Sequence, residues 1–169
     1  PDYACLGGSL IIEIKRFIGD PNKRLSNAVA AAAERDTWPK FLGEWPLESV
    51  LKNLPAAEAE ALRKRVFDRL GRAIVTHMEK ANSQLHAYCH VRSDVHLRLL
   101  VLINEDFEAY DPTSVTSIVS REYQKMRHDG SMRYADIDAV VFLTERHATL
   151  LNGSITFPVV AIESPWIEG

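Results

Sequence analysis

The first seventeen residues constrain the fold most, because Gly7 and Gly8 separate two short apolar runs. Glycine reaches positive φ without steric cost, so this pair is typical of a two-residue hairpin turn. With Gly7 and Gly8 as the loop, Asp2 lies opposite Glu13, and opposed residues share one face of an antiparallel pair. Residues two apart on a strand also share a face, which brings Lys15 to the same side. The other face is expected to point into a core through Leu10, Ile12 and Ile14.

Two carboxylates that face each other on neighbouring strands repel, and a cation between them removes that repulsion. Mg²⁺ prefers oxygen ligands and is often held by one or two carboxylates together with waters and phosphates. The charged face that carries Asp2 and Glu13 therefore fits a divalent cation. The alternative interpretation is an ordinary solvated face, in which Glu13 and Lys15 form a surface ion pair.

The composition is typical of one soluble globular domain spanning residues 1–169, with 46% hydrophobic and 25% charged residues. No apolar run approaches the roughly 20 residues that cross a bilayer, and the chain does not start like a signal peptide. We therefore expect no membrane association and a cytoplasmic location. Two cysteines, Cys5 and Cys89, are too few for a disulfide framework and are expected to be buried thiols. The net charge of −3 does not favour nucleic-acid binding, although a local basic strip is compatible with it.

Helices are expected to dominate the first half of the chain after the hairpin. An alanine-rich run predicts a helix over residues 23–35. Lys23 and Arg24 at its start are candidate phosphate contacts, or simply the solvated end of that helix. Residues 37–54 are expected to form an irregular insertion, which ends with a short helix over residues 47–53.

A long helix is expected to begin at Pro55, a residue that suits a first helical turn. Apolar residues then recur at three- and four-residue steps, which is typical of a helix with one buried face. Near the end of this helix, His86 and His90 are spaced to share one helical face beside Cys89, and they form a candidate zinc pair that has no clear fourth ligand. The buried stripe consists of Leu62, Val66, Leu70, Ile74, Met78, Ala81, Leu85 and Tyr88.

The second half is expected to alternate strands with one helix. Asp111 and Pro112 predict a helix start, with Asp111 as N-cap, and the helix is expected to run to about His128 and to close at Gly130. Its inward side is expected to carry Val115, Ile118, Val119, Tyr123 and Met126. Strands are predicted over residues 96–104, 137–144 and 155–163, with a hairpin turn at Asn152-Gly153 and an edge or bulge at Pro158. The fold class is therefore α/β, with helices covering a mixed central sheet.

These features resemble the PD-(D/E)xK nuclease superfamily, whose fold is a restriction-endonuclease-like mixed sheet flanked by helices. The resemblance rests on Pro1-Asp2, on Glu13-Ile14-Lys15 in the next strand, and on the helix and apolar strand that follow. It extends to about Asn104, so that residues 105–169 are a C-terminal elaboration. Members of the superfamily have a helix and a strand before the proline-aspartate pair. Either these elements precede Pro1 in a longer chain or the domain is degenerate.

The resemblance implies that Asp2, Glu13 and the backbone carbonyl of Ile14 ligate Mg²⁺ or Mn²⁺. Lys15 would orient the attacking water or stabilise the charge that develops on the phosphate. Many members also use a lysine or glutamine on the helix after the motif. Candidate nucleic-acid contacts are therefore Arg16, Lys23, Arg24 and Gln84.

The implied function is metal-dependent hydrolysis of nucleic-acid phosphodiester bonds, with DNA as the favoured substrate. Because many members dimerise, a homodimer is a further expectation. A catalytically inactive nuclease-like module for binding or assembly is the main alternative. A third interpretation is an enzyme of another class, in which the hairpin carboxylates only form surface salt bridges.

Overall fold

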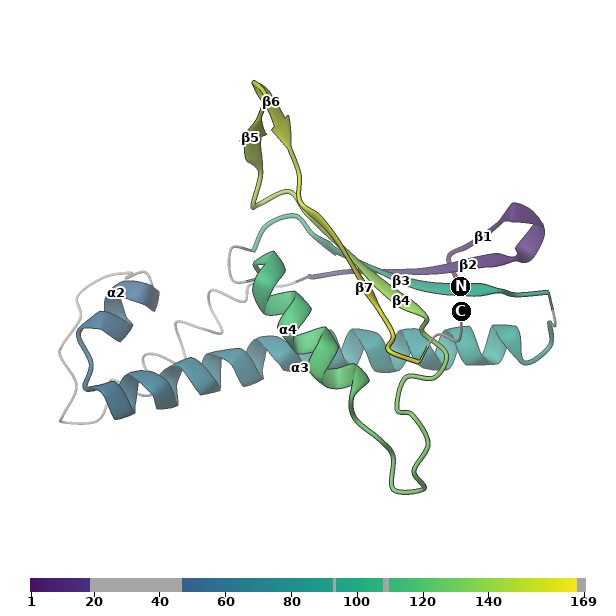
Figure 1. Ribbon diagram of the computed structural model, residues 1–169, viewed down its shortest axis with the longest axis horizontal. Coiled ribbons are helices and arrows are strands. Elements are labelled where there is room, and N and C mark those ends of the chain that lie inside the picture. The colour runs from purple at the N-terminus through teal and green to yellow at the C-terminus, as the bar shows by residue number, and fades with distance from the viewer. Residues whose placement is uncertain (19–46, 93, 108–109, 167–169) are drawn as a thin grey trace. The chain divides into compact units, whose positions relative to one another are not determined.

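The computed structural model describes residues 1–18, 47–92, 94–107 and 110–166 (Figure 1). Its contacts divide the chain into two compact units, one of residues 1–18 with 71–169 and one of residues 19–70, and each unit is described by itself. The helix expected over residues 23–35 lies outside the described residues, together with Lys23 and Arg24, and so do residues 37–46 of the expected insertion.

The larger unit is built on a five-stranded sheet in the order β1-β2-β3-β4-β7. Strands β2, β3 and β4 run parallel to one another, and the outer strands β1 and β7 are antiparallel to their neighbours. This mixed sheet confirms the predicted α/β class. The strands are β1 (Tyr3–Cys5), β2 (Leu10–Arg16), β3 (Leu97–Asn104), β4 (Ala139–Thr144) and β7 (Val159–Glu163).

The first hairpin has the predicted register, with Tyr3 opposite Ile12 and Cys5 opposite Leu10. A short 3₁₀ turn, η1 (Leu6–Gly8), connects the two strands. Gly7 and Gly8 both have positive φ, at 69° and 104°, as the turn prediction requires. At Gly8 the space is also restricted, because a Cβ atom there would lie 3.1 Å from a carboxylate oxygen of Asp94.

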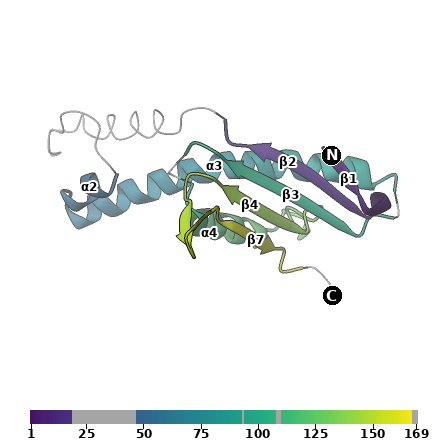
Figure 2. The same cartoon turned by 90° about the horizontal axis from the view of Figure 1, so that it is seen from above.

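Two helices cover one face of this sheet, as Figures 1 and 2 show: the part of α3 (Ala56–Cys89) that begins at Gly71, and α4 (Pro112–Tyr123). The predicted apolar stripe of α3 is buried along this part. The predicted cap of α4 is also present, because Asp111 Oδ1 accepts hydrogen bonds from the backbone N–H groups of Thr113 and Ser114, each at 3.0 Å. The stripe residues of α3 that are buried here are Ile74, Met78, Ala81 and Leu85.

The smaller unit contains α2 (Leu47–Lys52) and the first part of α3, which confirms the short and the long helix expected there. Apolar side chains from both helices and their connection form a small core of their own. Its buried members are Val50, Leu51, Leu54, Ala59, Leu62 and Val66, with Leu70 partly buried against them.

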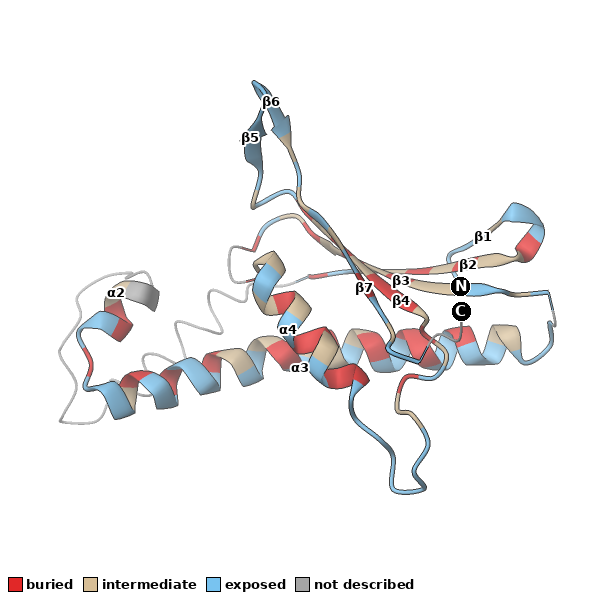
Figure 3. Ribbon diagram, viewed as in Figure 1, coloured by how far each residue is buried: buried red, intermediate tan, exposed pale blue. Residues whose placement is uncertain are grey.

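The helices cover the face of β2 that was not expected to form the core. Ile11 and Glu13 are almost completely buried beneath the helices, at 0% and 1% exposure. Leu10, Ile12 and Ile14 lie on the opposite face and are only partly buried, as Figure 3 shows for β2. The expectation that these three residues point into the core was therefore wrong. Alternation along β2 separates Leu10, Ile12 and Ile14 from the face of Ile11 and Glu13, and the position of the helices decides which of these two faces is covered.

The helix α4 ends at Tyr123 rather than near His128, because the chain then folds back on itself. The backbone N–H of Arg133 donates to the carbonyl of Lys125 at 3.2 Å, and Met126 pairs with Met132. Met126 is consequently 52% exposed instead of facing inward. Gly130, with φ of 79°, forms the turn of this loop and does not close the helix.

The strand predicted over residues 155–163 is divided into two strands. Its first part, β6 (Ser154–Thr156), pairs with β5 (Thr149–Leu151) in a separate hairpin, and its second part is β7. Pro158 lies at the division, where its missing N–H interrupts a ladder. Asn152 and Gly153, with φ of 51° and 79°, form the predicted hairpin turn. Cys5 and Cys89 are free thiols and only partly buried, which corrects the expectation of buried thiols.

Candidate functional site

Glu13 lies on the helix-covered face of β2, and its carboxylate is buried there, with 1% exposure. Lys15, two residues further along β2, forms an ion pair with its Oε1 atom. The nitrogen of Pro1 lies 3.6 Å from the other oxygen, Oε2. Oε2 itself is buried and accepts no hydrogen bond. The hairpin therefore brings Glu13 and Lys15 together as predicted, and it leaves the other carboxylate oxygen, which the Pro1 nitrogen approaches, without a hydrogen bond.

Asp2 lies at the register position opposite Glu13, next to the observed Tyr3–Ile12 pair. Its backbone N–H donates to the carbonyl of Ile12 at 3.0 Å, and its carboxylate accepts from the backbone N–H of Ile14 at 2.7 Å. In an antiparallel pair the N–H and C=O groups of one residue point to the same side of the strand. The carbonyl of Ile14 therefore faces the same edge of β2 as the Asp2 carboxylate.

The donor atoms of Asp2, Glu13 and Ile14 are of the types that suit a hard divalent cation. Carboxylate and carbonyl oxygens are the ligands that Mg²⁺ prefers in proteins, and Mn²⁺ accepts the same donors. A buried carboxylate oxygen without a hydrogen bond is costly, and coordination of Glu13 Oε2 to a cation would remove that cost. Within the described parts of the chain, no three His, Cys, Asp or Glu side chains gather as a metal cluster, so a cation here would rely on Asp2, Glu13 and the carbonyl of Ile14.

The helix α3 adds a histidine that the sequence analysis did not identify. The ring of His77 packs edge-on against Phe17, with ring centroids 5.3 Å apart. Burial lowers the pKa of His77, and the positive charges of Lys15 and Lys80 lower it further. Its Nδ1 atom is buried and has no hydrogen-bond partner. A neutral imidazole therefore lies beside the Glu13–Lys15 pair, sixty-two residues along the chain from Lys15.

Gln84, the predicted contact on α3, lies close to the level of Glu13 along the sheet. The helix runs antiparallel to β2 (Figure 2). Gln84 follows His77 by two helical turns, or about 10.5 Å at 1.5 Å per residue. Glu13 precedes Phe17 by four strand residues, or about 13 Å. The side chain of Gln84 is exposed there. The position and exposure of Gln84 are therefore compatible with its predicted role as a nucleic-acid contact.

Arg16, another predicted nucleic-acid contact, already has a carboxylate partner. It forms an ion pair with Glu105, and the hydrogen bond to Glu105 together with the negative charges nearby raises the pKa of Arg16. Both side chains are exposed, so this pair can exchange partners at little cost.

The candidate zinc pair at the end of α3 is engaged in other contacts. His86 Nδ1 lies 3.1 Å from Asp136 Oδ2, and the rings of His86 and His90 stack with centroids 5.9 Å apart. Asp136 also accepts from Arg98 at 3.2 Å. This group joins the end of α3 to the start of β3 and to the loop before β4, a role in packing.

A second buried glutamate, Glu122 on α4, is surrounded by cations. Lys125 Nζ donates to its Oε1 at 2.6 Å, and the guanidinium groups of Arg121 and Arg133 each approach to 3.7 Å. Burial strongly raises the pKa of the neighbouring Tyr134 hydroxyl, which therefore stays protonated. Glu122 is 0% exposed, and this set of charges joins α4 to the loop that follows it.

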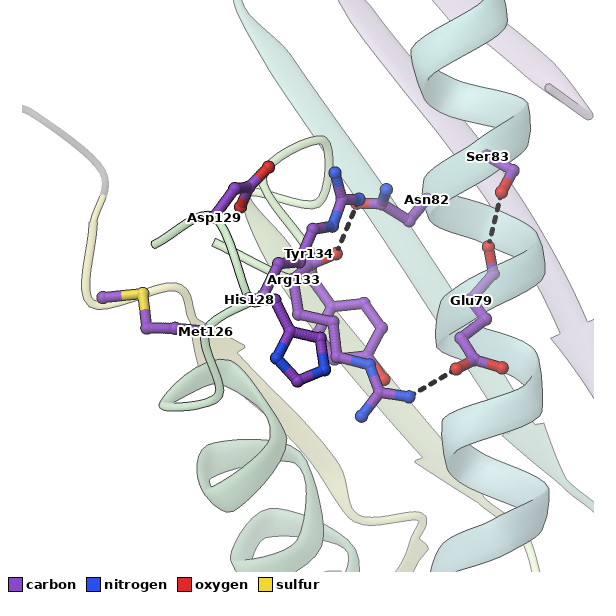
Figure 4. Close-up of a pocket in the computed structure, with 9 residues that line it drawn as sticks. Glu79, Asn82, Ser83, Met126, His128, Asp129, Arg133 and Tyr134 are labelled. Atoms are coloured by element: carbon purple, nitrogen blue, oxygen red, sulfur yellow. Dashed lines mark hydrogen bonds and ion pairs between the residues drawn. The ribbon is translucent and has the colours of Figure 1, made fainter. Parts of the chain in front are cut away.

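Arg133 also lines a cleft of about 790 Å³ between α3 and the loop after α4 (Figure 4). Its guanidinium forms an ion pair with Glu79 across the cleft and lies over the ring of Tyr134, 5.4 Å from the ring centroid. In Figure 4 the ring of His128 lies next to the side chains of Arg133 and Tyr134. Because the two facing charges neutralise each other, the cleft does not present a concentrated charge to a ligand.

No protein-family model, no curated protein and no solved structure matches this chain. Among the described residues, no helix has the length and apolarity that crossing a bilayer requires.

Proposed function

We propose that this chain is a metal-dependent nuclease that hydrolyses phosphodiester bonds of nucleic acid, with DNA as the substrate favoured by the resemblance described above. The observation that carries the proposal is the state of Glu13: a carboxylate with 1% exposure that is paired with Lys15 through one oxygen and has no hydrogen bond at the other. The desolvation cost of such a group is high, and around Glu13 the described side chains supply one cation, Lys15, together with a second carboxylate, Asp2, at the opposing register position.

Asp2, Glu13 and the carbonyl of Ile14 would hold Mg²⁺ or Mn²⁺. When bound, such a cation neutralises phosphate charge and lowers the pKa of a coordinated water. Lys15 supplies a point charge next to Glu13, where negative charge develops on the phosphate as the bond breaks. His77 presents a neutral ring nitrogen near Lys15. Gln84 offers an exposed amide that can donate to a phosphate oxygen or accept from a base.

Cleavage of supercoiled plasmid and of single-stranded DNA, in Mg²⁺ or Mn²⁺ and in EDTA, tests this proposal. The wild type should cleave at least one substrate only when the divalent cation is present. Glu13→Gln and Lys15→Ala should each lower the cleavage rate by at least about 100-fold. The matched controls are Glu122→Gln and Lys125→Ala, which remove the other buried glutamate and its lysine partner, and both should retain cleavage at temperatures where they are folded.

Three results would contradict the proposal, and the first two would support the alternatives. DNA binding without cleavage under any condition would indicate an inactive binding or assembly module. Absence of both DNA binding and Mn²⁺ binding would indicate that the carboxylates of the hairpin only form salt bridges. Cleavage that survives both Glu13→Gln and Lys15→Ala would place the active site elsewhere in the chain.

A further inference from the structure

The second face of the main sheet is apolar, and no described element of its unit covers it. Figures 1 and 2 show α3 and α4 on the same side of the sheet, and the side chains of the other face are mostly half-buried (Figure 3). The strand registers place these residues together on what we call the open face. Its apolar members are Tyr3, Cys5, Leu10, Ile12, Ile14, Leu97, Leu99, Val101, Ile103, Ala139, Val141, Leu143, Val159 and Ala161.

A sheet of this kind is not stable with such a face in water. Parallel strands occur almost only where both faces of the sheet are covered, and their two-sided apolar composition reflects this. The central strands β2, β3 and β4 are parallel, and their residues on the open face are apolar apart from Arg16, whereas the covered face of β2 carries Glu13 and Lys15. The composition of the open face is therefore that of an interface.

The hairpin of β5 and β6, which we call the arm, rises from the end of the sheet on the side of the open face (Figure 1). Its side chains are unusually exposed for their type: Leu150 is 75% exposed, Leu151 61%, Ile155 68% and Phe157 53%. Residues 148–159 include no charged residue. An isolated two-stranded hairpin is marginally stable in water, so the arm also needs a partner surface. The absence of charge makes that surface a protein rather than a nucleic acid.

The apolar area of the open face and the arm together is close to the area that each subunit buries in a stable dimer. Strands about 4.8 Å apart, with same-face residues about 6.7 Å apart along each strand, give the open face roughly 500 Å². The exposed parts of the arm's apolar side chains add roughly 300 Å², at about 100 Å² for an aliphatic and about 200 Å² for an aromatic side chain. The total is close to the roughly 800 Å² per partner that specific interfaces bury. It exceeds the roughly 300–600 Å² of the largest apolar patch on a typical monomer.

Two charged residues at the border of the open face, Arg16 and Glu163, can pair across a two-fold axis if Arg16 exchanges its present partner Glu105. Arg16 and Glu163 lie at opposite corners, three strands apart and four residues apart along the strands. This corresponds to about 14 Å across and about 13 Å along the strands, a diagonal near 45°. A two-fold axis in the plane of the interface that exchanges these corners pairs Arg16 with Glu163 of the second copy twice. With this axis, the strands of the two copies cross each other at about 90°, which is one of the two preferred angles of sheet packing.

We propose that the open face and the arm form the interface between two copies of this chain, packed sheet on sheet with each arm against the partner. The interface is on the opposite face of the sheet from Glu13 and Lys15, and it does not depend on the proposed nuclease activity. Its apolar area, which is close to that of a specific interface, and the Arg16–Glu163 pairing that a two-fold axis allows favour a second copy as the occupant.

Sedimentation equilibrium over nanomolar to micromolar concentrations tests the proposal. The wild type should be a dimer. Ile155→Lys, on the exposed arm where folding tolerates it, should weaken the dimer at least about tenfold. Val91→Lys, at a 78% exposed position away from the open face, should behave as the wild type. Glu163→Arg should weaken the dimer by opposing two arginines, and Arg16→Glu combined with Glu163→Arg should restore it.

A monomeric wild type at micromolar concentrations would overturn the proposal and would mean that another part of a chain or another protein covers the open face. A dimer that Ile155→Lys and Glu163→Arg leave unchanged would also overturn it, because the interface would then lie elsewhere. Far-ultraviolet circular dichroism of each variant checks that the fold is retained, and the charge reversal keeps the test decisive even where one variant alone unfolds.

Discussion

Two buried glutamates, Glu13 on β2 and Glu122 on α4, have similar local arrangements and different surroundings. Each is at most 1% exposed, each is paired with a lysine a few residues along the chain, and each has one carboxylate oxygen without a hydrogen bond. The lysine partners are Lys15 and Lys125. From burial and pairing alone, the two sites cannot be distinguished.

The charges around them differ. Arg121 and Arg133 add to Lys125 around Glu122, so that cations surround this single carboxylate. Around Glu13, Lys15 is the side-chain cation among the described residues that forms an ion pair, and Asp2 adds a second carboxylate at the opposing register position.

Three side-chain cations neutralise the buried Glu122. Two carboxylates that share one lysine side chain, Asp2 and Glu13 with Lys15, leave a place for a metal ion. We therefore interpret Glu122 as a structural group and Glu13 as a functional one. Removing the charges at each site in turn tests whether Glu13 is functional and Glu122 structural. The following predictions are ordered from the largest expected effect to the smallest.

Glu13→Gln should lower the rate of DNA cleavage about 10³-fold, the size of effect seen when one group that stabilises transition-state charge is removed. Glutamine keeps the shape of the side chain and removes the charge that would hold the cation. Initial rates of plasmid nicking in Mn²⁺ measure the effect. Comparable rates for Glu13→Gln and the wild type would end the distinction between the two glutamates.

Glu122→Gln should lower the free energy of unfolding by about 3 kcal/mol, because three cations lose their buried partner. Urea denaturation followed by circular dichroism measures this loss. The variant should cleave DNA at the wild-type rate where it is folded. If Glu122→Gln were instead inactive and fully stable, the assignment of the two glutamates would be reversed.

Lys15→Ala should lower the cleavage rate about 100-fold while leaving the affinity for Mn²⁺ largely unchanged, because Lys15 acts on the phosphate and not on the metal. Cleavage rates at saturating Mn²⁺, with Lys125→Ala as the matched control, measure the effect. A loss of activity that excess Mn²⁺ restores would show that Lys15 only organises Glu13.

Asp111→Ala should lower the free energy of unfolding by about 1 kcal/mol without changing cleavage, since it removes the N-cap of the helix that carries Glu122. Burial alone would raise the pKa of Asp111, but hydrogen bonds from Ser114 and Thr113 outweigh it and lower that pKa. A carboxylate with a lowered pKa in the folded state stabilises fully above its unfolded pKa of about 3.9, and this contribution disappears as the pH falls through the folded pKa.

The difference in stability between the wild type and Asp111→Ala should therefore be constant from neutral pH down to about pH 4 and shrink below it. Denaturation midpoints at a series of pH values measure this. A difference that grows on acidification would mean that Asp111 acts by some other contact than its cap.

The parts of the fold that local chemistry decides could be predicted from the sequence. The hairpin register follows from Gly7-Gly8, the buried stripe of α3 from its helical spacing, and the cap of α4 from Asp111 and Pro112. The pairing of Glu13 with Lys15 belongs to this group, because one strand supplies both residues.

Features that depend on distant residues could not be predicted in the same way. The apolar residues of β2 lie mainly on its open face, but α3 covers the other face, so Glu13 is buried where an accessible charge was expected. The end of α4 depends on a return contact from Arg133, which nothing in the run after Tyr123 indicates. His77 joins the site only because α3 passes over Phe17.

Thermal unfolding with and without Mn²⁺ tests the central claim, that Asp2 and Glu13 form a divalent cation site, most directly. At a concentration of one hundred times Kd, a ligand bound only by the folded state stabilises it by about 2.7 kcal/mol. For a chain of this size that raises the Tm by about 5 °C or more. We expect this rise in the wild type and in Glu122→Gln, the latter from a lower starting Tm, and its absence in Glu13→Gln and Asp2→Asn. A wild-type Tm that does not respond to Mn²⁺, or an undiminished response in Glu13→Gln, would contradict the account.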